Sequence, residues 1–228
     1  MIPLKDDNPS RLTPYINYGI IIACVLVFLW QLSLGPVRGQ KAVYAFGTIP
    51  AVLTGNVRLP ADIAVISPWM SILTSMFLHG GWMHLIGNML YLWIFGDNVE
   101  DSMGHGRFFI FYVLCGLAAV LAQALPDPGS QVPMIGASGA ISGVLGAYLL
   151  LFPRARIHVL IPLGFILQSA RLPAMWVLLF WFALQLLSSL LQGTESAGVA
   201  FRAHIGGFLA GIALIPLFKF RDVRLFNR

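Results

Sequence analysis

The stretch Gly136-Ala137-Ser138-Gly139-Ala140-Ile141-Ser142-Gly143 follows a polar, proline-rich loop and opens an apolar segment that continues to Phe152. A serine flanked by glycines at the start of such a segment has two interpretations. It is a small residue that lets membrane helices pack closely, which is the commoner case in a Gly/Ala-rich helix, or it is a nucleophile. The motif alone favours packing, so the choice depends on which residues the rest of the chain places beside Ser138.

The composition is that of a polytopic membrane protein. Of the 228 residues, 58% are hydrophobic and only 10% are charged, which is far from the composition of soluble globular domains. The net charge of +5 does not indicate a nucleic-acid partner, because most basic residues lie at the ends of apolar segments, where they set membrane orientation. Cys24 and Cys115 lie inside apolar runs, so we expect no disulfide and no metal, and nothing in the sequence implies a cofactor.

Six apolar segments are expected to cross the roughly 30 Å of membrane hydrocarbon as helices. They cover residues 16–34, 82–95, 108–125, 138–152, 174–191 and 203–218. Residues 35–70 carry four prolines and only short apolar groups, which predicts a long first loop of amphipathic or re-entrant pieces at the interface. Residues 159–167 are also short and interrupted, and we expect an interfacial loop there. The fold class is therefore an all-α polytopic membrane bundle, a single domain over 1–228 with short cytoplasmic tails at 1–14 and 219–228.

An even number of spans places both termini on one side, and the basic residues choose that side. If the termini are cytoplasmic, ten Lys and Arg residues lie inside and four lie outside. The inner ten are Lys5, Arg11, Arg107, Arg154, Arg156, Arg171, Lys219, Arg221, Arg224 and Arg228, and the outer four are Arg38, Lys41, Arg58 and Arg202. This bias predicts cytoplasmic termini.

With this orientation, polar side chains from three distant segments fall at a similar depth near the external side. They are His79, His84 and Asn88 on or just before the second span, Ser138 on the fourth and His204 on the sixth. Because polar groups in hydrocarbon are costly, they usually face the bundle interior or a water-filled cavity. A shared depth therefore predicts one common cavity.

The chemistry of these side chains suits acyl transfer. Ser138 needs a neighbouring base to act as a nucleophile, and the His204 imidazole can take and return a proton near neutral pH. His84 and Asn88 lie four residues apart on one helical face, and both can donate hydrogen bonds to an oxyanion, as can the Ser138 backbone N–H near a helix N-terminus. No acidic residue lies at this depth, so we expect a dyad without a carboxylate.

Glycines around these residues are expected to let the fourth and sixth spans approach closely enough for a serine–histidine hydrogen bond. They are Gly136, Gly139, Gly143, Gly207 and Gly211. Taken singly, each polar group also has a structural explanation: Ser138 as packing, His204 as a hydrogen-bonded core histidine, His84 and Asn88 as ties between a loop and a helix end, and His79 as part of the loop. Only their coincidence at one depth favours a site.

Three segments, in this order, resemble the rhomboid family of intramembrane serine proteases: HGGWMHLIGN (79–88), GASG (136–139) and AHIGGFLAG (203–211). Glu100 also resembles a family position, and the similarity extends from about residue 14 to 220. The resemblance implies a six-helix protease in which Ser138 is the nucleophile, His204 the general base, and His84 and Asn88 the oxyanion-stabilising pair. Many family members carry Trp-Arg before the second span, whereas this chain reads Pro68-Trp69-Met70-Ser71 and lacks the arginine.

The resemblance implies partners as well: the substrates would be transmembrane segments of other proteins, cleaved near their outer ends within the lipid bilayer. The short soluble tails and the lack of a transit-like N-terminus favour a prokaryotic cytoplasmic membrane, with the site open to the external side. The alternative is a catalytically silent rhomboid-like protein that binds or escorts membrane proteins. A transporter is a third class, but it needs ionisable residues along a path through the midplane, and the inner halves of these spans carry almost none.

Overall fold

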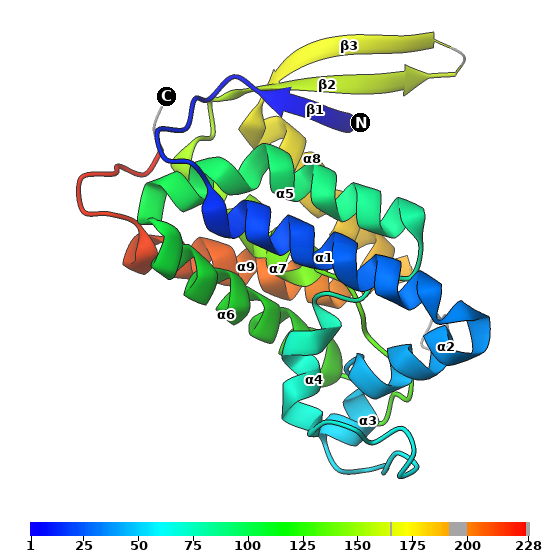
Figure 1. The fold of residues 1–228 in the computed structure, drawn as a ribbon. Coiled ribbons are helices and arrows are strands. Elements are labelled where there is room, and N and C mark those ends of the chain that lie inside the picture. The colour runs from blue at the N-terminus through cyan, green and yellow to red at the C-terminus, as the bar shows by residue number, and fades with distance from the viewer. Residues whose placement is uncertain (165, 192–199, 227–228) are drawn as a thin grey trace.

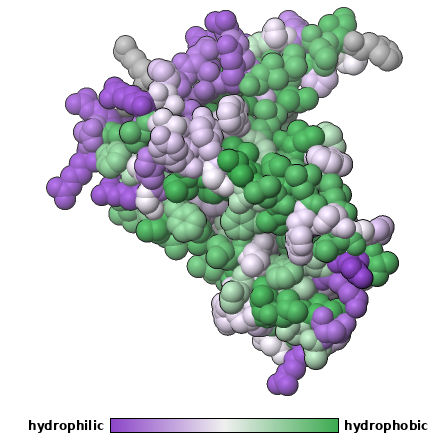
Figure 2. Space-filling model, in the orientation of Figure 1, coloured by the Kyte–Doolittle hydropathy of each residue, from purple (hydrophilic) through white to green (hydrophobic). Residues whose placement is uncertain are grey.

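The computed structural model describes residues 1–164, 166–191 and 200–226. Six long helices form a bundle, a small sheet and both ends of the described chain lie at one end of it, and three short helices lie at the other (Figure 1). Hydrophobic residues cover much of the visible surface between the two ends, while hydrophilic residues gather toward the ends (Figure 2). A lateral apolar belt between two polar ends is what a bilayer requires of a protein that spans it.

Each predicted span corresponds to one helix, although the fourth is too short to cross the whole hydrocarbon region. These helices are α1 (Tyr15–Ser33), α5 (Trp82–Met103), α6 (His105–Ala124), α7 (Ser138–Leu151), α8 (Ala174–Leu191) and α9 (Phe201–Phe218). Among the described residues, α1, α6, α8 and α9 are long and apolar enough to cross a membrane. The predicted helical polytopic bundle is confirmed.

Helix α5 is longer than the sequence indicated. The prediction ended this span at Phe95, because the polar run that begins at Gly96 reads as a helix end, but the helix continues to Met103. Its last turns stay helical because their polar groups find partners from the N-terminal segment: Asn98 Nδ2 donates to the Asn8 carbonyl, and the fully buried Glu100 accepts from the start of α1.

The interpretation of residues 159–167 as a loop is wrong. Strands β2 (Arg156–Leu163) and β3 (Ile166–Pro173) form an antiparallel hairpin, and β1 (Ile2–Asp6) from the predicted N-terminal tail pairs with β2 to complete a three-stranded sheet. Ile157 and Val159 of β2 are fully buried, whereas Arg156 is exposed and His158 and Leu160 are partly exposed, which is the period-two alternation of a half-buried strand. Gly164, at φ +62°, lies in the turn that joins the two strands.

The long first loop forms three short helices, α2 (Gly35–Phe46), α3 (Pro50–Leu53) and α4 (Pro68–Ser75). Their 12, 4 and 8 residues confirm that this region holds pieces too short to span. Proline occupies the first position of α3 and α4, where a missing backbone N–H costs nothing. The Ser67 side chain caps α4 by accepting a hydrogen bond from the Met70 N–H.

Helix α7 is the centre of the bundle. It packs against α5, α6, α8 and α9, and every residue from Ala140 to Tyr148 is buried. Its largest interface is with α9. The serine at the start of α7 is therefore held by the most enclosed helix of the protein.

Candidate active site

Ser138 and His204 are in direct contact. Ser138 is the first residue of α7, His204 lies in the first turn of α9, and Ser138 Oγ is 2.8 Å from His204 Nε2. The His204 ring is buried, with 7% of the residue exposed. The two residues are 66 positions apart in the chain, so only the packing of α7 on α9 brings them together.

Glycines make that packing possible. A β-carbon on Gly207 would collide with the Gly139 carbonyl, and one on Gly211 would collide with the Gly143 carbonyl. The backbones of α7 and α9 therefore touch directly, as small residues at membrane helix interfaces allow. These four glycines are among those named in the sequence analysis, and they lie at the contact between α7 and α9.

The length of α7 determines the depth of Ser138. Its 14 residues extend only about 21 Å at ~1.5 Å per residue, against roughly 30 Å of hydrocarbon. A helix this short cannot reach both membrane surfaces. If its C-terminal end, which is followed by Pro153 and Arg154, lies at one surface, Ser138 lies below the other.

A cavity of about 1260 Å³ reaches Ser138. Its walls include Ser138, His204, His84 and Asn88, which are four of the five polar residues that the sequence analysis placed at one depth; the fifth, His79, does not line it. A hydrophilic reaction below the membrane surface needs such a space, because water has to reach the serine.

His84 places its Nε2 atom against the segment that leads into Ser138. The Gly80 N–H donates to His84 Nδ1 at 3.3 Å, so the ring proton resides on Nε2 when the imidazole is neutral. A β-carbon on Gly136 would lie only 2.6 Å from His84 Nε2. Gly136, two residues before Ser138, also has a φ of +119°, so both space and backbone conformation require glycine there.

Asn88 carries a buried donor that is not in use. Its Nδ2 atom has no hydrogen-bond partner among the residues that the structure describes, and a β-carbon on Gly136 would lie 3.7 Å from it. Buried polar groups are nearly always paired, so an unpaired donor beside a serine suggests a site for an acceptor that arrives from outside.

The structure adds one residue that the sequence analysis missed. Gln185 on α8 places Oε1 2.7 Å from His204 Nδ1, so the imidazole lies between Gln185 and Ser138. The available signal was the lone amide of a mostly apolar span, since polar side chains in such segments usually face a functional partner.

His79, by contrast, is part of the loop, as expected. It is 2% exposed, its Nδ1 contacts the Phe77 carbonyl at 3.1 Å, and its backbone N–H donates to Gln31 on α1. Ser142 donates to the Ser138 carbonyl and stabilises the first turn of α7. Neither residue contacts the Ser138 hydroxyl.

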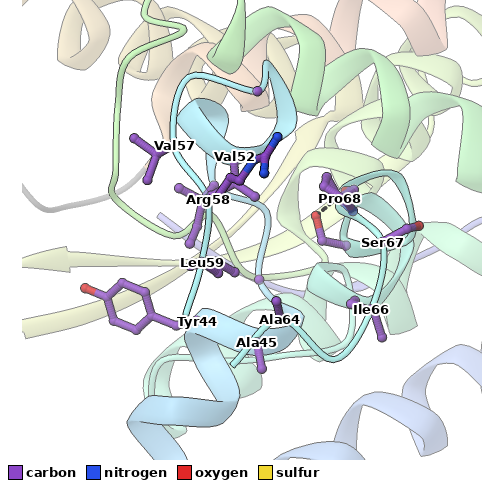
Figure 3. Close-up of a pocket in the computed structure, with 14 residues that line it drawn as sticks. Tyr44, Ala45, Val52, Val57, Arg58, Leu59, Ala64, Ile66, Ser67 and Pro68 are labelled. Atoms are coloured by element: carbon purple, nitrogen blue, oxygen red, sulfur yellow. Dashed lines mark hydrogen bonds between the residues drawn. The ribbon is translucent and has the colours of Figure 1, made fainter. Parts of the chain in front are cut away.

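A second, smaller cavity of about 390 Å³ lies among α2, α3 and α4. Tyr44, Arg58, Ser67 and Ser71 contribute the polar side chains of its otherwise mostly apolar wall (Figure 3). None of the polar residues around Ser138 lines it. In the described part of the chain, no three His, Cys, Asp or Glu side chains are arranged to hold a metal ion.

Comparison with known proteins agrees with the resemblance seen in the motifs. Residues 67–220 match the model of the Rhomboid domain. Over 136 residues the chain is 43% identical to "Rhomboid protease GluP" of Bacillus subtilis (strain 168), covering 60% of this chain and 24% of that protein. Over 137 residues it is 32% identical to "Putative rhomboid protease YdcA" of the same organism, covering 58% of this chain and 66% of that protein.

A plant protein is also similar to this chain. "RHOMBOID-like protein 5" of Arabidopsis thaliana is 33% identical over 143 residues, which is 63% of this chain and 42% of that protein. The chain thus spans less than two thirds of the length of each of these three relatives. The match to the Rhomboid domain covers more than half of the chain, and the structure is a bundle of apolar helices. This integral membrane protein therefore belongs to the rhomboid family.

Proposed function

We propose that this protein is an intramembrane serine endopeptidase that cleaves transmembrane segments of other membrane proteins near the external face. The observation that carries the proposal is the 2.8 Å contact between Ser138 Oγ and His204 Nε2 at the wall of a large cavity. The two Bacillus subtilis relatives, one named a rhomboid protease and the other a putative rhomboid protease, support the same reaction class.

In the acylation step, Ser138 Oγ attacks the carbonyl carbon of the scissile peptide bond while His204 Nε2 takes the hydroxyl proton. The carbonyl π electrons move to oxygen and form a tetrahedral oxyanion. When this intermediate collapses, the C–N bond breaks, and His204 returns its proton to the leaving amine. The carboxyl part of the substrate remains as an ester on Ser138.

The oxyanion would be stabilised by His84 Nε2–H, Asn88 Nδ2–H and the Ser138 backbone N–H. The N–H groups in the first turn of α7 have no partner within the helix, and the helix dipole favours negative charge there. Donors fixed in advance around a developing charge are usually the largest single contribution to catalysis of this kind.

Deacylation repeats the sequence with water. His204 takes a proton from a water molecule in the cavity, the resulting hydroxide attacks the ester, and Ser138 leaves with the proton that His204 returns. The cavity supports this step because it provides a water-accessible volume beside both residues. By the basic-residue count of the sequence, the cavity faces the external side and both termini are cytoplasmic.

The test combines labelling with cleavage. The purified full-length protein is treated with a serine-reactive phosphonate probe and, separately, incubated in lipid vesicles with a model transmembrane substrate. We expect labelling and cleavage by the wild type, and neither by Ser138→Ala or His204→Ala. A Ser138→Ala protein that still cleaved the substrate would refute the proposal. A folded wild type that is neither labelled nor active would favour the alternative of a catalytically silent binding or escort protein.

A further inference from the structure

We propose that Gln185 on α8 is a positioning residue that sets the tautomer and orientation of His204, so that the reacting unit is a Ser138–His204–Gln185 relay without a carboxylate. This inference rests on the proposed protease function and adds a residue to its machinery. It is carried by the 2.7 Å contact between Gln185 Oε1 and His204 Nδ1, on the side of the ring opposite Ser138.

The direction of each hydrogen bond follows from a backbone carbonyl. Gln185 Nε2 donates to the Trp181 carbonyl one turn earlier on α8, at 3.4 Å. A carbonyl only accepts, so the amide NH₂ group faces Trp181 and the amide oxygen faces His204. A hydrogen bond within α8 thus determines which way the Gln185 amide is turned.

The imidazole tautomer follows from the amide. Because Gln185 Oε1 only accepts, His204 Nδ1 carries the hydrogen and donates it. The lone pair then lies on Nε2, and the Ser138 hydroxyl donates to it across 2.8 Å. This is the tautomer that a general base needs, since the opposite one would place a hydrogen between Nε2 and the serine.

Helix α8 also fixes the plane of the ring. The Trp181 ring lies 6.0 Å from the His204 ring, centroid to centroid, at an interplanar angle of 33°. Beside it, Phe182 stacks on Phe208 of α9 with centroids 4.5 Å apart. Trp181 and Gln185 are four residues apart and therefore share one helical face, so the seating of α8 on α9 orients the base.

A neutral amide differs from the aspartate of a serine protease triad in one important respect. It accepts from Nδ1 as a carboxylate does, but it carries no charge to stabilise the imidazolium and needs no desolvation of an anion in hydrocarbon. In a membrane site, an amide can therefore set the tautomer of the histidine without burying a charged carboxylate. Among the described residues, no Asp or Glu side chain contacts His204.

The experiment measures phosphonate labelling rates of the full-length protein from pH 5 to 9. Gln185→Met removes the acceptor at similar length, and Gln185→Glu keeps an acceptor and adds a charge. The matched control is Gln31→Met on α1, where a buried glutamine bonds the His79 backbone rather than a proposed catalytic group. Thermal midpoints of all proteins are recorded in parallel.

We expect Gln185→Met to lower the plateau labelling rate by about 10- to 100-fold, the range in which an orienting partner of a histidine acts. Gln185→Glu should label at high pH but with its half-maximal rate moved to higher pH, because a carboxylate stabilises the imidazolium. Gln31→Met should lower the thermal midpoint and leave the half-maximal pH unchanged.

Two results separate the inference from the function on which it rests. If the wild type is labelled through Ser138, while Gln185→Met labels at the wild-type rate or Gln185→Glu keeps the wild-type pH profile, the positioning role is wrong and the protease proposal stands. If the folded wild type is not labelled at all, both are overturned. Should Gln185→Met not fold, the pH profile of Gln185→Glu decides alone.

Discussion

Glu100 on α5 accepts a hydrogen bond from the backbone N–H of Asn17 in the first turn of α1, at 2.8 Å. The other carboxylate oxygen accepts from the Ile16 N–H at 3.0 Å, and Glu100 is fully buried. One side chain thus satisfies two N–H groups in the first turn of α1 that have no partner within the helix, and it compensates the positive end of the helix dipole. His105 contacts the same carboxylate from the first turn of α6.

This relationship predicts that Glu100→Ala lowers the free energy of unfolding by roughly 2–3 kcal/mol, because two buried N–H groups lose a charged acceptor. The measurement is reversible unfolding in mixed micelles. The contrasting variant is Asp62→Ala, which removes an exposed ion pair with Lys41 at 3.1 Å. That pair should contribute about 1 kcal/mol or less, so equal losses in the two variants would contradict the capping role.

The N-terminal strand should respond to pH through Asp6. Burial raises the pKa of this carboxyl to about 6, although the hydrogen bond donated by Tyr148 at 2.6 Å opposes the rise. A raised pKa means that the folded protein binds the proton more tightly than the unfolded chain. The stability from Asp6 is therefore complete below the unfolded pKa near 4 and is lost as the pH rises through about 6.

Asp6→Asn tests this sign. The amide keeps an acceptor for Tyr148 but does not ionise, so the variant should lose less stability than the wild type between pH 5 and pH 7. Thermal midpoints of both proteins across that range give the comparison. Parallel curves for the wild type and Asp6→Asn would show that Asp6 has no part in the pH dependence.

Most of the bundle follows from sequence because hydrocarbon thickness sets the length of a membrane helix. Helix α8 begins at the predicted residue, Ala174, since a proline precedes it in the sequence. The hairpin was missed for a different reason. Residues 159–167 form a short apolar run interrupted by Pro162 and Gly164, which has no distinctive period, and the pairing of this strand also involves β1, some 150 residues earlier.

The contacts of the candidate site also fall into one that the sequence could predict and one that it could not. The contact between Ser138 and His204 could be anticipated, because polar groups in three spans fall at one depth and small residues permit close approach. The contact between Gln185 and His204 could not, because it depends on the rotation of α8 about its axis. An apolar helix exposed to lipid on most of its surface gives no periodic signal for that rotation.

The approach of α7 to α9 leads to a steric prediction. Gly207→Val places a β-branched side chain against the Gly139 carbonyl, where no space exists. We expect the helices to separate, with at least a tenfold loss of phosphonate labelling and a lower thermal midpoint. The control is Gly19→Val on α1, where an added β-carbon meets no atom within 4 Å. Equal labelling by both variants would show that the close approach is not needed for the contact of Ser138 with His204.

Asn88 offers a prediction in which activity and stability change in opposite directions. Its Nδ2 donor is buried without a partner in the described part of the chain, so Asn88→Ala removes an unsatisfied group and should leave the free energy of unfolding unchanged or higher. If that donor stabilises the oxyanion, the same variant should lower the rate of substrate cleavage about 10²- to 10³-fold.

Asn98 is the matched control, because its Nδ2 is already paired with the Asn8 carbonyl at 3.0 Å. Asn98→Ala should lose stability and keep its cleavage rate per folded molecule. A destabilised but active Asn88→Ala protein would place Asn88 among structural residues and leave His84 and the Ser138 backbone N–H as the remaining oxyanion donors.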